Sequence, residues 1–525
     1  MKSSKLSLLI LILAVGVARA QSGLGATADT PIRPDSALVE ILSHMKGQSL
    51  RLAEALQLAQ KNSTQVLMAE AAMRAAKGSL RRARGGFDPE VFLEYGRLGN
   101  DMPSSSPFGG ASVVETEQTN TSTGLRLKLP IGTQIEAGVD ARRLETNSAF
   151  AALNPEYSAT SKLQLTQPLL KGFGPAAKSD LASTRRWYDA AVARYEEAVL
   201  NLEADVEGKY WDLYAAERDL AVQMLVYDRG TAFLNQANLR AKAGLVGPSD
   251  VAKARVFVAD QQQQVFDREE ELDRVSDQLA SMIGQRPADT ATRFRPADAP
   301  SSTYEELPSV ETLLTQAFEQ NRGLRAAEMD LEAARSLESG GKWNAWPTLD
   351  LVGSIGGNGL SGTAQQIEFG GETFTSEFDG DAGDSWSQAI GRDYQTWFLG
   401  LNFVMPIGLR PGGGERDRLT AERMRSEQSR LDVKLTLEED VRAYHRELLH
   451  AQQRLDAAGE GVDASNEQVR IGTLDYDYGR ISAVELVLLA EDLAKAQQSL
   501  TRALVKAAKA QSGLKKLTTS PVNSN

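Results

Sequence analysis

The stretch from Leu202 to Tyr227 reads LEADVEGKYWDLYAAERDLAVQMLVY, and it decides the fold of the chain. Apolar side chains recur in it every seven residues, at Val206, Leu213, Leu220 and Tyr227. A seven-residue period is typical of helices that pack side by side as coiled coils. A helix from about Lys178 to Ala243 has a length of roughly 100 Å at 1.5 Å per residue. Helices of that length build rods or tubes rather than compact domains.

A second apolar stripe follows this helix and predicts a returning partner. It consists of Val251, Val258, Val265, Leu272 and Leu279. The same two stripes occur late in the chain, first as Val441, Leu448, Leu455 and Val462, then as Leu486, Leu493, Leu500, Ala507 and Leu514. The sequence therefore predicts two long helical hairpins, over about 178–284 and 415–517.

Matching residues in the two halves keep constant separations, which indicates an internal tandem duplication. Six residues of the first hairpin, Leu202, Asp205, Val206, Leu213, Ala216 and Leu220, recur 235 positions later as Leu437, Asp440, Val441, Leu448, Ala451 and Leu455. Upstream, Leu56, Ala59, Ala69, Glu70, Ala75 and Ala76 recur 258 positions later as Leu314, Ala317, Ala327, Glu328, Ala333 and Ala334. We expect a first repeat over 21–284, a second over 310–517 and a tail over 518–525. Residues 285–309, which hold four prolines, are expected to be a surface linker.

The start of the chain has the pattern of a signal peptide. Lys2 and Lys5 precede an apolar run that ends at Val17, and small residues follow at Ala18 and Ala20. We expect residues 1–20 to be removed and the rest to be exported; an uncleaved signal anchor is the alternative. The chain has no cysteine, so it has no disulfide framework and no thiolate chemistry. No later segment is apolar enough for a spanning helix, so entry into a membrane would require a closed β-barrel.

Segments with a period of two lie between the short and the long helices of each half. Leu125, Leu127 and Leu129 alternate with polar or small residues, and Trp397, Leu399, Leu401 and Phe403 do the same. Such strands approach the ~9 to 11 residues that cross a bilayer at a tilt. Six strands are predicted, at about 90–98, 121–129, 133–144, 158–167, 348–354 and 396–405. The sheet of a soluble sandwich would show the same alternation.

Four prolines stand where strands and helices are expected to meet: Pro89, Pro168, Pro347 and Pro406. Proline disfavours helix in the residue before it and cannot donate to a sheet ladder, so it suits such a junction. Between the last two strands, residues 354–393 are rich in Gly and acidic residues and lack periodicity. We expect an extracellular loop there, with a cation site as the alternative, although no EF-hand spacing is present.

These features together resemble the TolC family of outer-membrane efflux and secretion ducts. The resemblance rests on the duplication, on Gln167-Pro168-Leu169-Leu170 and Met405-Pro406-Ile407, and on the two turns that join the long helices. It implies a mixed α/β membrane protein, a homotrimer in which an outer-membrane β-barrel is continued by a long periplasmic α-helical coiled-coil barrel. In the family each protomer contributes four strands, so six strands in this chain are a departure. The implied partners are a periplasmic adaptor protein, an inner-membrane pump and outer-membrane lipid.

The hairpin turns are the candidate functional sites. Gly244, Leu245, Val246, Gly479 and Ile481 are expected at the tips, where an adaptor would dock, although helix packing alone also explains them. By resemblance, Tyr476 and Glu485 match the tyrosine and the first of two aspartates at the family's periplasmic constriction, and Leu488 stands at the second. Asp250 occupies the corresponding place in the first tip, where capping of the returning helix is the simpler role. A ring of three carboxylates favours cations, so Glu485→Ala is expected to lower cation preference.

Other functional classes find no support in the sequence. The net charge of −12 is spread without a basic block, which argues against nucleic acid as a partner. His445 and His450 are five positions apart, about 140° out of alignment on a helix, so they form no metal pair. Neither Gly172-Phe173-Gly174 nor Gly412-Gly413-Gly414 leads into a phosphate loop. No enzyme activity and no cofactor are expected. The alternatives are an exported periplasmic coiled-coil scaffold without a pore and a passive porin, which has no use for such long helices.

Overall fold

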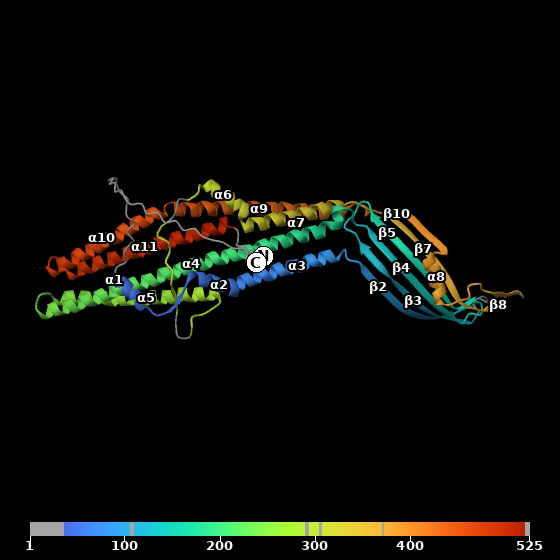
Figure 1. Ribbon diagram of the computed structural model, residues 1–525, viewed down its shortest axis with the longest axis horizontal. Coiled ribbons are helices and arrows are strands. Elements are labelled where there is room, and N and C mark those ends of the chain that lie inside the picture. Colours follow the sequence, from blue (N-terminus) through green and yellow to red (C-terminus); the bar gives the residue numbers. More distant parts are fainter. Residues whose placement is uncertain (1–35, 106–109, 289–292, 304–306, 370–371, 520–525) are drawn as a thin grey trace, which may run out of the picture.

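A computed structural model describes residues 36–105, 110–288, 293–303, 307–369 and 372–519 of the chain. The expected signal peptide, residues 1–20, lies outside the described residues, as do residues 520–525 of the expected tail. The molecule is elongated, with long helices over most of its length and a twisted sheet at one end (Figure 1).

The elements follow the repeat. The first half contains α1 (Ser36–His44), β1 (Gln48–Leu50), α2 (Leu52–Asn62), α3 (Thr64–Gly85), β2 (Glu90–Pro103), β3 (Val113–Lys128), β4 (Gln134–Thr146), β5 (Leu153–Pro168), α4 (Pro175–Lys242) and α5 (Pro248–Ile283). The second half contains β6 (Phe294–Pro296), α6 (Val310–Gln320), α7 (Arg322–Asn344), β7 (Thr348–Ala364), β8 (Gln366–Phe369), β9 (Glu372–Thr375), α8 (Ala382–Gly391), β10 (Tyr394–Val404), α9 (Arg410–Leu449), α10 (Ala451–Asp477) and α11 (Ala483–Thr518).

Helix α4 is a single unbroken helix of 68 residues, which corresponds to about 100 Å. It begins with Pro175, whose fixed φ and missing N–H suit the first helical position. Val206, Leu213 and Leu220 of the predicted stripe are buried against α2 and α5. Val441 and Leu448, the equivalents of Val206 and Leu213, form a separate core with Leu437, the equivalent of Leu202, and with α6 and α11. The two repeats therefore bury equivalent residues.

The second hairpin differs from the first because its outgoing helix is interrupted. Helices α9 and α10 meet at His450, whose φ of −105° and ψ of 8° leave the helical range. The equivalent position in α4 is Ala215, inside the unbroken helix. Alanine is the best helix former and histidine a poorer one. The single long helix expected from about residue 415 is thus two helices.

Six strands form one antiparallel sheet in the order β10-β7-β5-β4-β3-β2. The number and order of the six strands of this sheet along the chain agree with the sequence prediction, although β2, β3, β5 and β7 are longer than expected. Strands β2 and β10 lie at the two edges. The sheet therefore ends in two strands that each have one side unpaired within the chain.

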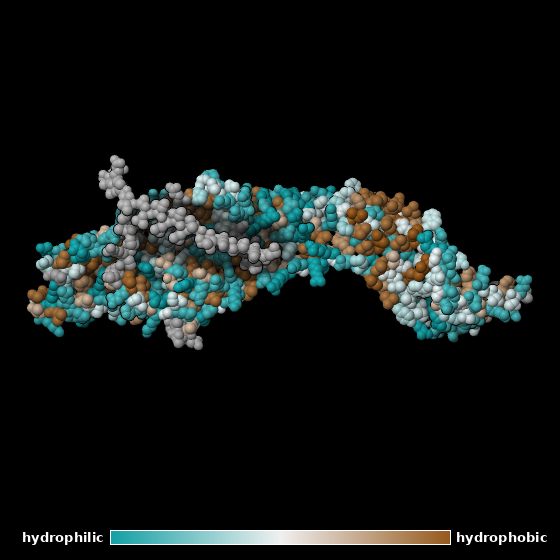
Figure 2. Space-filling view, viewed as in Figure 1, coloured by the Kyte–Doolittle hydropathy of each residue, from teal (hydrophilic) through white to brown (hydrophobic). Residues whose placement is uncertain are grey.

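The two faces of the sheet differ in chemistry. Direct cross-strand neighbours point to the same face, and the register places Leu163, Ile355 and Trp397 in one row and Leu165, Gly353 and Leu399 in the next. We call this the apolar face; it also carries exposed Val91, Leu93, Tyr95, Leu125, Leu401 and Phe403. The opposite face carries Glu94, Arg126, Glu136, Asp140, Lys162 and Gln164. Figure 2 shows hydrophobic residues gathered at the end of the sheet next to the helices and hydrophilic residues beyond them.

Residues 354–393 are structured, so the prediction of a loop is wrong. Strand β7 continues to Ala364, β8 and β9 form a hairpin, and α8 packs on β7 and β5. The glycines that obscured the pattern permit this packing: a Cβ on Gly359 would lie 1.9 Å from the carbonyl oxygen of Ser385. Two of the acidic residues, Asp381 and Asp384, form a capping box that starts α8.

The linker is also more ordered than expected. Its strand β6 pairs in parallel with β1, and Phe294 is 1% exposed in the core on α4. The Tyr210 hydroxyl accepts hydrogen bonds from the backbone N–H groups of Ala297 (3.0 Å) and Asp298 (2.9 Å). Arg295 pairs with the buried Glu217 and donates to two carbonyls at the end of α1, those of Leu42 and Met45. Residues 294–298 therefore tie the N-terminal segment to the middle of α4 rather than running over a surface.

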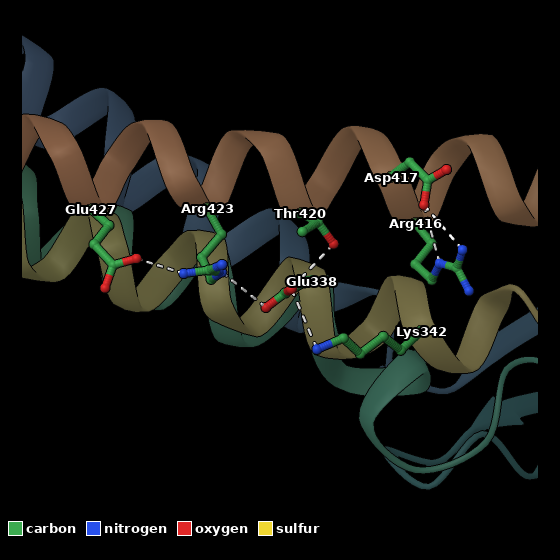
Figure 3. A network of polar contacts seen from close by, with 7 residues as sticks. All are labelled: Glu338, Lys342, Arg416, Asp417, Thr420, Arg423 and Glu427. Atoms are coloured by element: carbon green, nitrogen blue, oxygen red, sulfur yellow. Dashed lines mark hydrogen bonds and ion pairs between the residues drawn. The ribbon is translucent and has the colours of Figure 1, made fainter.

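A carboxylate joins the short and long helices of the second half near the sheet (Figure 3). Glu338 on α7 accepts a hydrogen bond from Thr420 and forms ion pairs with Arg423 of α9, at 3.4 Å, and with Lys342. Its side chain is 12% exposed. Two donors from α9, Thr420 and Arg423, thus meet one shielded carboxylate of α7 and hold the two helices together where they approach the strands.

Candidate functional site: the helical tips

Both long hairpins turn at a glycine at the end of the molecule that lies away from the sheet. Gly244 and Gly479 have φ values of 73° and 71°, in the left-handed region that glycine tolerates best. They are equivalent in the two repeats, 235 positions apart. In each tip a backbone N–H just after the turn bonds back to the last helical turn, as in Leu245 to Arg240 and Arg480 to Asp475.

A cavity of about 650 Å³ lies between the two tips. Six of the eight tip residues proposed from sequence line it: Leu245, Val246, Asp250, Tyr476, Gly479 and Ile481. Gly244 and Glu485 are not among the lining residues. Helix α4 contributes Phe233 and Arg240, which sequence reasoning did not identify. Two segments more than 200 residues apart thus build one site.

Arg240 and Tyr476 form a contact between the tips of the two hairpins. The guanidinium carbon of Arg240 lies 4.2 Å from the centroid of the Tyr476 ring, a cation–π geometry. An arginine N–H also donates to the backbone carbonyl of Tyr476 at 3.5 Å. The rings of Phe233 and Tyr476 are arranged edge to face, with centroids 6.0 Å apart. Tyr476 is only 3% exposed as a result.

The two repeats differ at the position of Arg240. Position 240 is Arg in the first repeat and Asp475 in the second, and Tyr476 corresponds to Ala241. The last turns of α4 and α10 therefore carry side chains of opposite charge at one position and of different size at the next. Here the departure from the repeat coincides with a contact between the two copies.

The two tip carboxylates, both expected near the aperture, differ in their contacts. Glu485 forms a capping box with Ser482: its carboxylate accepts from the Ser482 N–H at 2.7 Å, and the Ser482 hydroxyl accepts from the Glu485 N–H at 3.3 Å. Asp250 lies in the first turn of α5 and lines the cavity, while the N-cap residue Gly247 has no side chain to cap that helix. Glu485 thus stabilises a helix start, and Asp250 brings negative charge to the cavity.

Behind the cavity, a row of amide and carboxylate groups joins three helices. Gln223 of α4 donates to Gln261 of α5 at 2.6 Å, and Gln261 donates to Glu491 of α11 at 3.3 Å. Gln223 and Gln261 are buried. Buried amides that satisfy one another favour one register over others. This row therefore fixes the registry of the two hairpins just behind the tips.

The four junction prolines lie at the opposite end of the helices. Pro89 and Pro347 directly precede β2 and β7, Pro168 is the last residue of β5, and Pro406 follows the end of β10 by two residues. Among the described residues, no group of three or more His, Asp or Glu side chains is placed to hold a metal ion. None of the described helices is long and apolar enough to cross a membrane.

Solved structures share this fold at low sequence identity. A membrane protein from Pseudomonas aeruginosa superposes with a TM-score of 0.65 and 15% identity, over 90% of this chain and 91% of that chain. The CmeC outer membrane channel of Campylobacter jejuni gives 0.63 and 13%, over 89% and 85%. The MtrE outer membrane channel of Neisseria gonorrhoeae, in its open state, gives 0.61 and 17%, over 89% and 88%. A search of curated proteins found no match.

The fold is thus that of outer-membrane channels. The chain belongs to the outer membrane efflux protein family, whose model matches residues 55–285 and 313–520. This confirms the family resemblance drawn from the sequence, and the two matched segments coincide with the two expected repeats to within three residues at their C-terminal ends.

Proposed function

We propose that this protein is the outer-membrane exit duct of a tripartite efflux or type I secretion system. In this role it conducts substrates outward and performs no chemistry on them. The observation that carries the proposal is the two-faced sheet, apolar on one side and charged on the other, continued by hairpins about 100 Å long.

The free edges of the sheet support assembly into a closed barrel. Pairing of β10 of one copy with β2 of the next removes both unpaired edges. The family resemblance implies a homotrimer, and three six-stranded sheets give about eighteen strands, a number that leaves an aqueous channel. The apolar face then meets lipid, and the charged face lines the channel.

The helical part would form a periplasmic tunnel whose inner end is closed by the tips. Three copies bring three sets of Arg240, Tyr476 and Asp250 around one axis. Because Arg240 holds the second hairpin to the first within each copy, we propose that the closed aperture requires this contact and that opening breaks it. The tip residues Gly244, Leu245, Val246, Gly479 and Ile481 are proposed to receive a periplasmic adaptor, which links the duct to an inner-membrane pump.

Two measurements test this function: the location of the protein in the cell and the mass of its oligomer. The mature chain is located by density fractionation of membranes, and its mass is measured by light scattering in detergent. A trimer in the outer-membrane fraction, with single-channel conductance in planar bilayers, supports the duct. A soluble periplasmic monomer or dimer without conductance would overturn the barrel and leave a coiled-coil scaffold as the function.

A further inference from the structure

Helix α8 lies on the apolar face of the sheet, directly beyond the exposed apolar rows. The Ser161 hydroxyl donates to the Ala389 carbonyl at 2.5 Å, and a Cβ on Gly357 would lie 2.5 Å from the same oxygen. Ser161 and Gly357 are cross-strand neighbours two residues beyond Leu163 and Ile355, so their side chains point to the same face. On the proposed function, this is the face that meets lipid.

The contacts also give the direction of α8. Its first turn lies near the outward end of β7, where the Ser361 hydroxyl donates to the Asp381 carbonyl at 2.6 Å. Its last turn lies against Gly357, next to Ile355. Helix α8 therefore runs back along β7, and its C-terminal turn ends beside the apolar rows.

The chain connection places this turn at the outer boundary of the membrane. Only Arg392 and Asp393 separate α8 from β10. Strand β10 has 11 residues, the length of a strand that crosses the hydrocarbon core once. Its apolar-face residues end outward at Trp397, and tryptophan is characteristic of the membrane interface. The turn that precedes β10 must then lie where hydrocarbon gives way to head groups.

The exposed side chains of α8 fit that environment. Ser385 and Ala389 are buried against the sheet, whereas Ile390, in the last turn, is 62% exposed. Trp386 lies one turn earlier on the same flank of the helix and is half-buried. An aliphatic and an aromatic side chain on one flank of a short polar helix are the groups that interfacial helices insert.

We propose that the C-terminal turn of α8 rests on the outer leaflet of the membrane, with Ile390 inserted at the level of the lipid head groups. This inference rests on the proposed function. Helix α8 then lies on the outside of the sheet and limits how deeply the sheet inserts into lipid.

Site-directed labelling tests the proposal, because the chain has no native cysteine. Ile390→Cys, Leu399→Cys and Thr363→Cys are each labelled with a polarity-sensitive fluorophore. The trimers are reconstituted into vesicles that contain lipids brominated near the head group. Leu399 lies exposed in the apolar rows, and Thr363 is exposed near the outward end of β7. We expect quenching at position 390 to exceed that at 363 at least about twofold and to approach that at 399.

Three other outcomes of the quenching experiment would contradict either the placement of α8 or the placement of the sheet. Quenching at 390 equal to that at 363, with 399 strongly quenched, would show that α8 stands in water and would overturn this inference alone. A label at 390 shielded from lipid and from aqueous iodide would show that protein covers α8, which also overturns it. Absence of lipid quenching at 399 would instead overturn the proposed membrane placement of the sheet.

Discussion

The guanidinium group of Arg240 stacks 4.2 Å from the ring centroid of Tyr476 and so joins the tips of two hairpins that come from different repeats. A cation–π contact of this kind contributes about 1 kcal/mol, which changes a closed-to-open ratio about fivefold. In a trimer the contact occurs three times around the axis. Its loss should therefore have a larger effect on the aperture than on the stability of a single chain.

Arg240→Ala is expected to increase the conductance or open probability of single channels, because it releases the second hairpin at the tip. Tyr476→Ala should act in the same direction, and the double variant should add little to either single one. Arg255→Ala is the matched control, since Arg255 is an exposed arginine of α5 that does not line the cavity. Equal conductance in all four proteins would argue against a role for this contact in closure.

The different contacts of the two tip carboxylates give a second prediction. Glu485→Ala removes half of a capping box and should cost about 1 kcal/mol of local helix stability. Asp250→Asn keeps the size of the side chain but removes charge from the cavity, and it should lower cation preference. Reversal potentials in a salt gradient measure the preference, and hydrogen exchange at the start of α11 measures the cap. A loss of cation preference in Glu485→Ala with none in Asp250→Asn would restore the role that the family resemblance assigns to Glu485.

The packing of α8 on glycine gives a third prediction. Gly359→Val places side-chain atoms where the Ser385 carbonyl now lies, 1.9 Å from the Cβ position, and should displace α8 from the sheet at a cost of about 1–3 kcal/mol. Gly353→Val is the control, because the nearest atom to its Cβ is 3.8 Å away on the side chain of Leu399. Ala389→Cys, at a buried position, reports the displacement by its reaction with a maleimide. Slow labelling in the Gly359→Val background would contradict the close approach.

The ion pair between Arg295 and Glu217 predicts a dependence of stability on pH. Burial raises the pKa of the Glu217 carboxyl, and the Arg295 guanidinium opposes that rise. Because the folded-state pKa lies above the usual value, ionisation of Glu217 costs folding free energy, and this cost appears as pH rises through that pKa. Arg295→Met removes the compensating charge, so it should destabilise the protein by about 3 kcal/mol at pH 7 and by less at pH 5.

Thermal unfolding followed by circular dichroism at both pH values measures this difference. Arg274→Met is the control, because Arg274 pairs with Glu271 in solvent, where an ion pair contributes about 0–1 kcal/mol. An Arg295→Met variant equally destabilised at the two pH values would show that its effect comes from the lost contacts to Leu42 and Met45 rather than from Glu217.

The sequence by itself determined the duplicated plan, the long hairpins, the six strands and the glycines at the tips. These features follow from local physical rules: apolar residues repeat every seven positions in packed helices and every two in a two-faced sheet. Glycine and proline mark the places where those patterns stop. The periodic signals lie within a few turns of the chain, and the duplication appears as constant separations of 235 and 258 positions, so neither requires knowledge of what packs against it.

Only the tertiary structure decided which residues meet across the repeats. Nothing near Arg240 in sequence points to Tyr476, and nothing near Gly359 points to Ser385, because these contacts join segments that the fold brings together. The same cause explains the two wrong predictions. Residues 294–296 of the linker form a strand because they pair with β1. The glycine-rich segment continues as β7 and packs against α8 because Gly357 and Gly359 leave room for the backbone of that helix. These two segments lack a local pattern because their residues pack closely against segments far away in the sequence. Periodicity along the chain carries no information about such contacts.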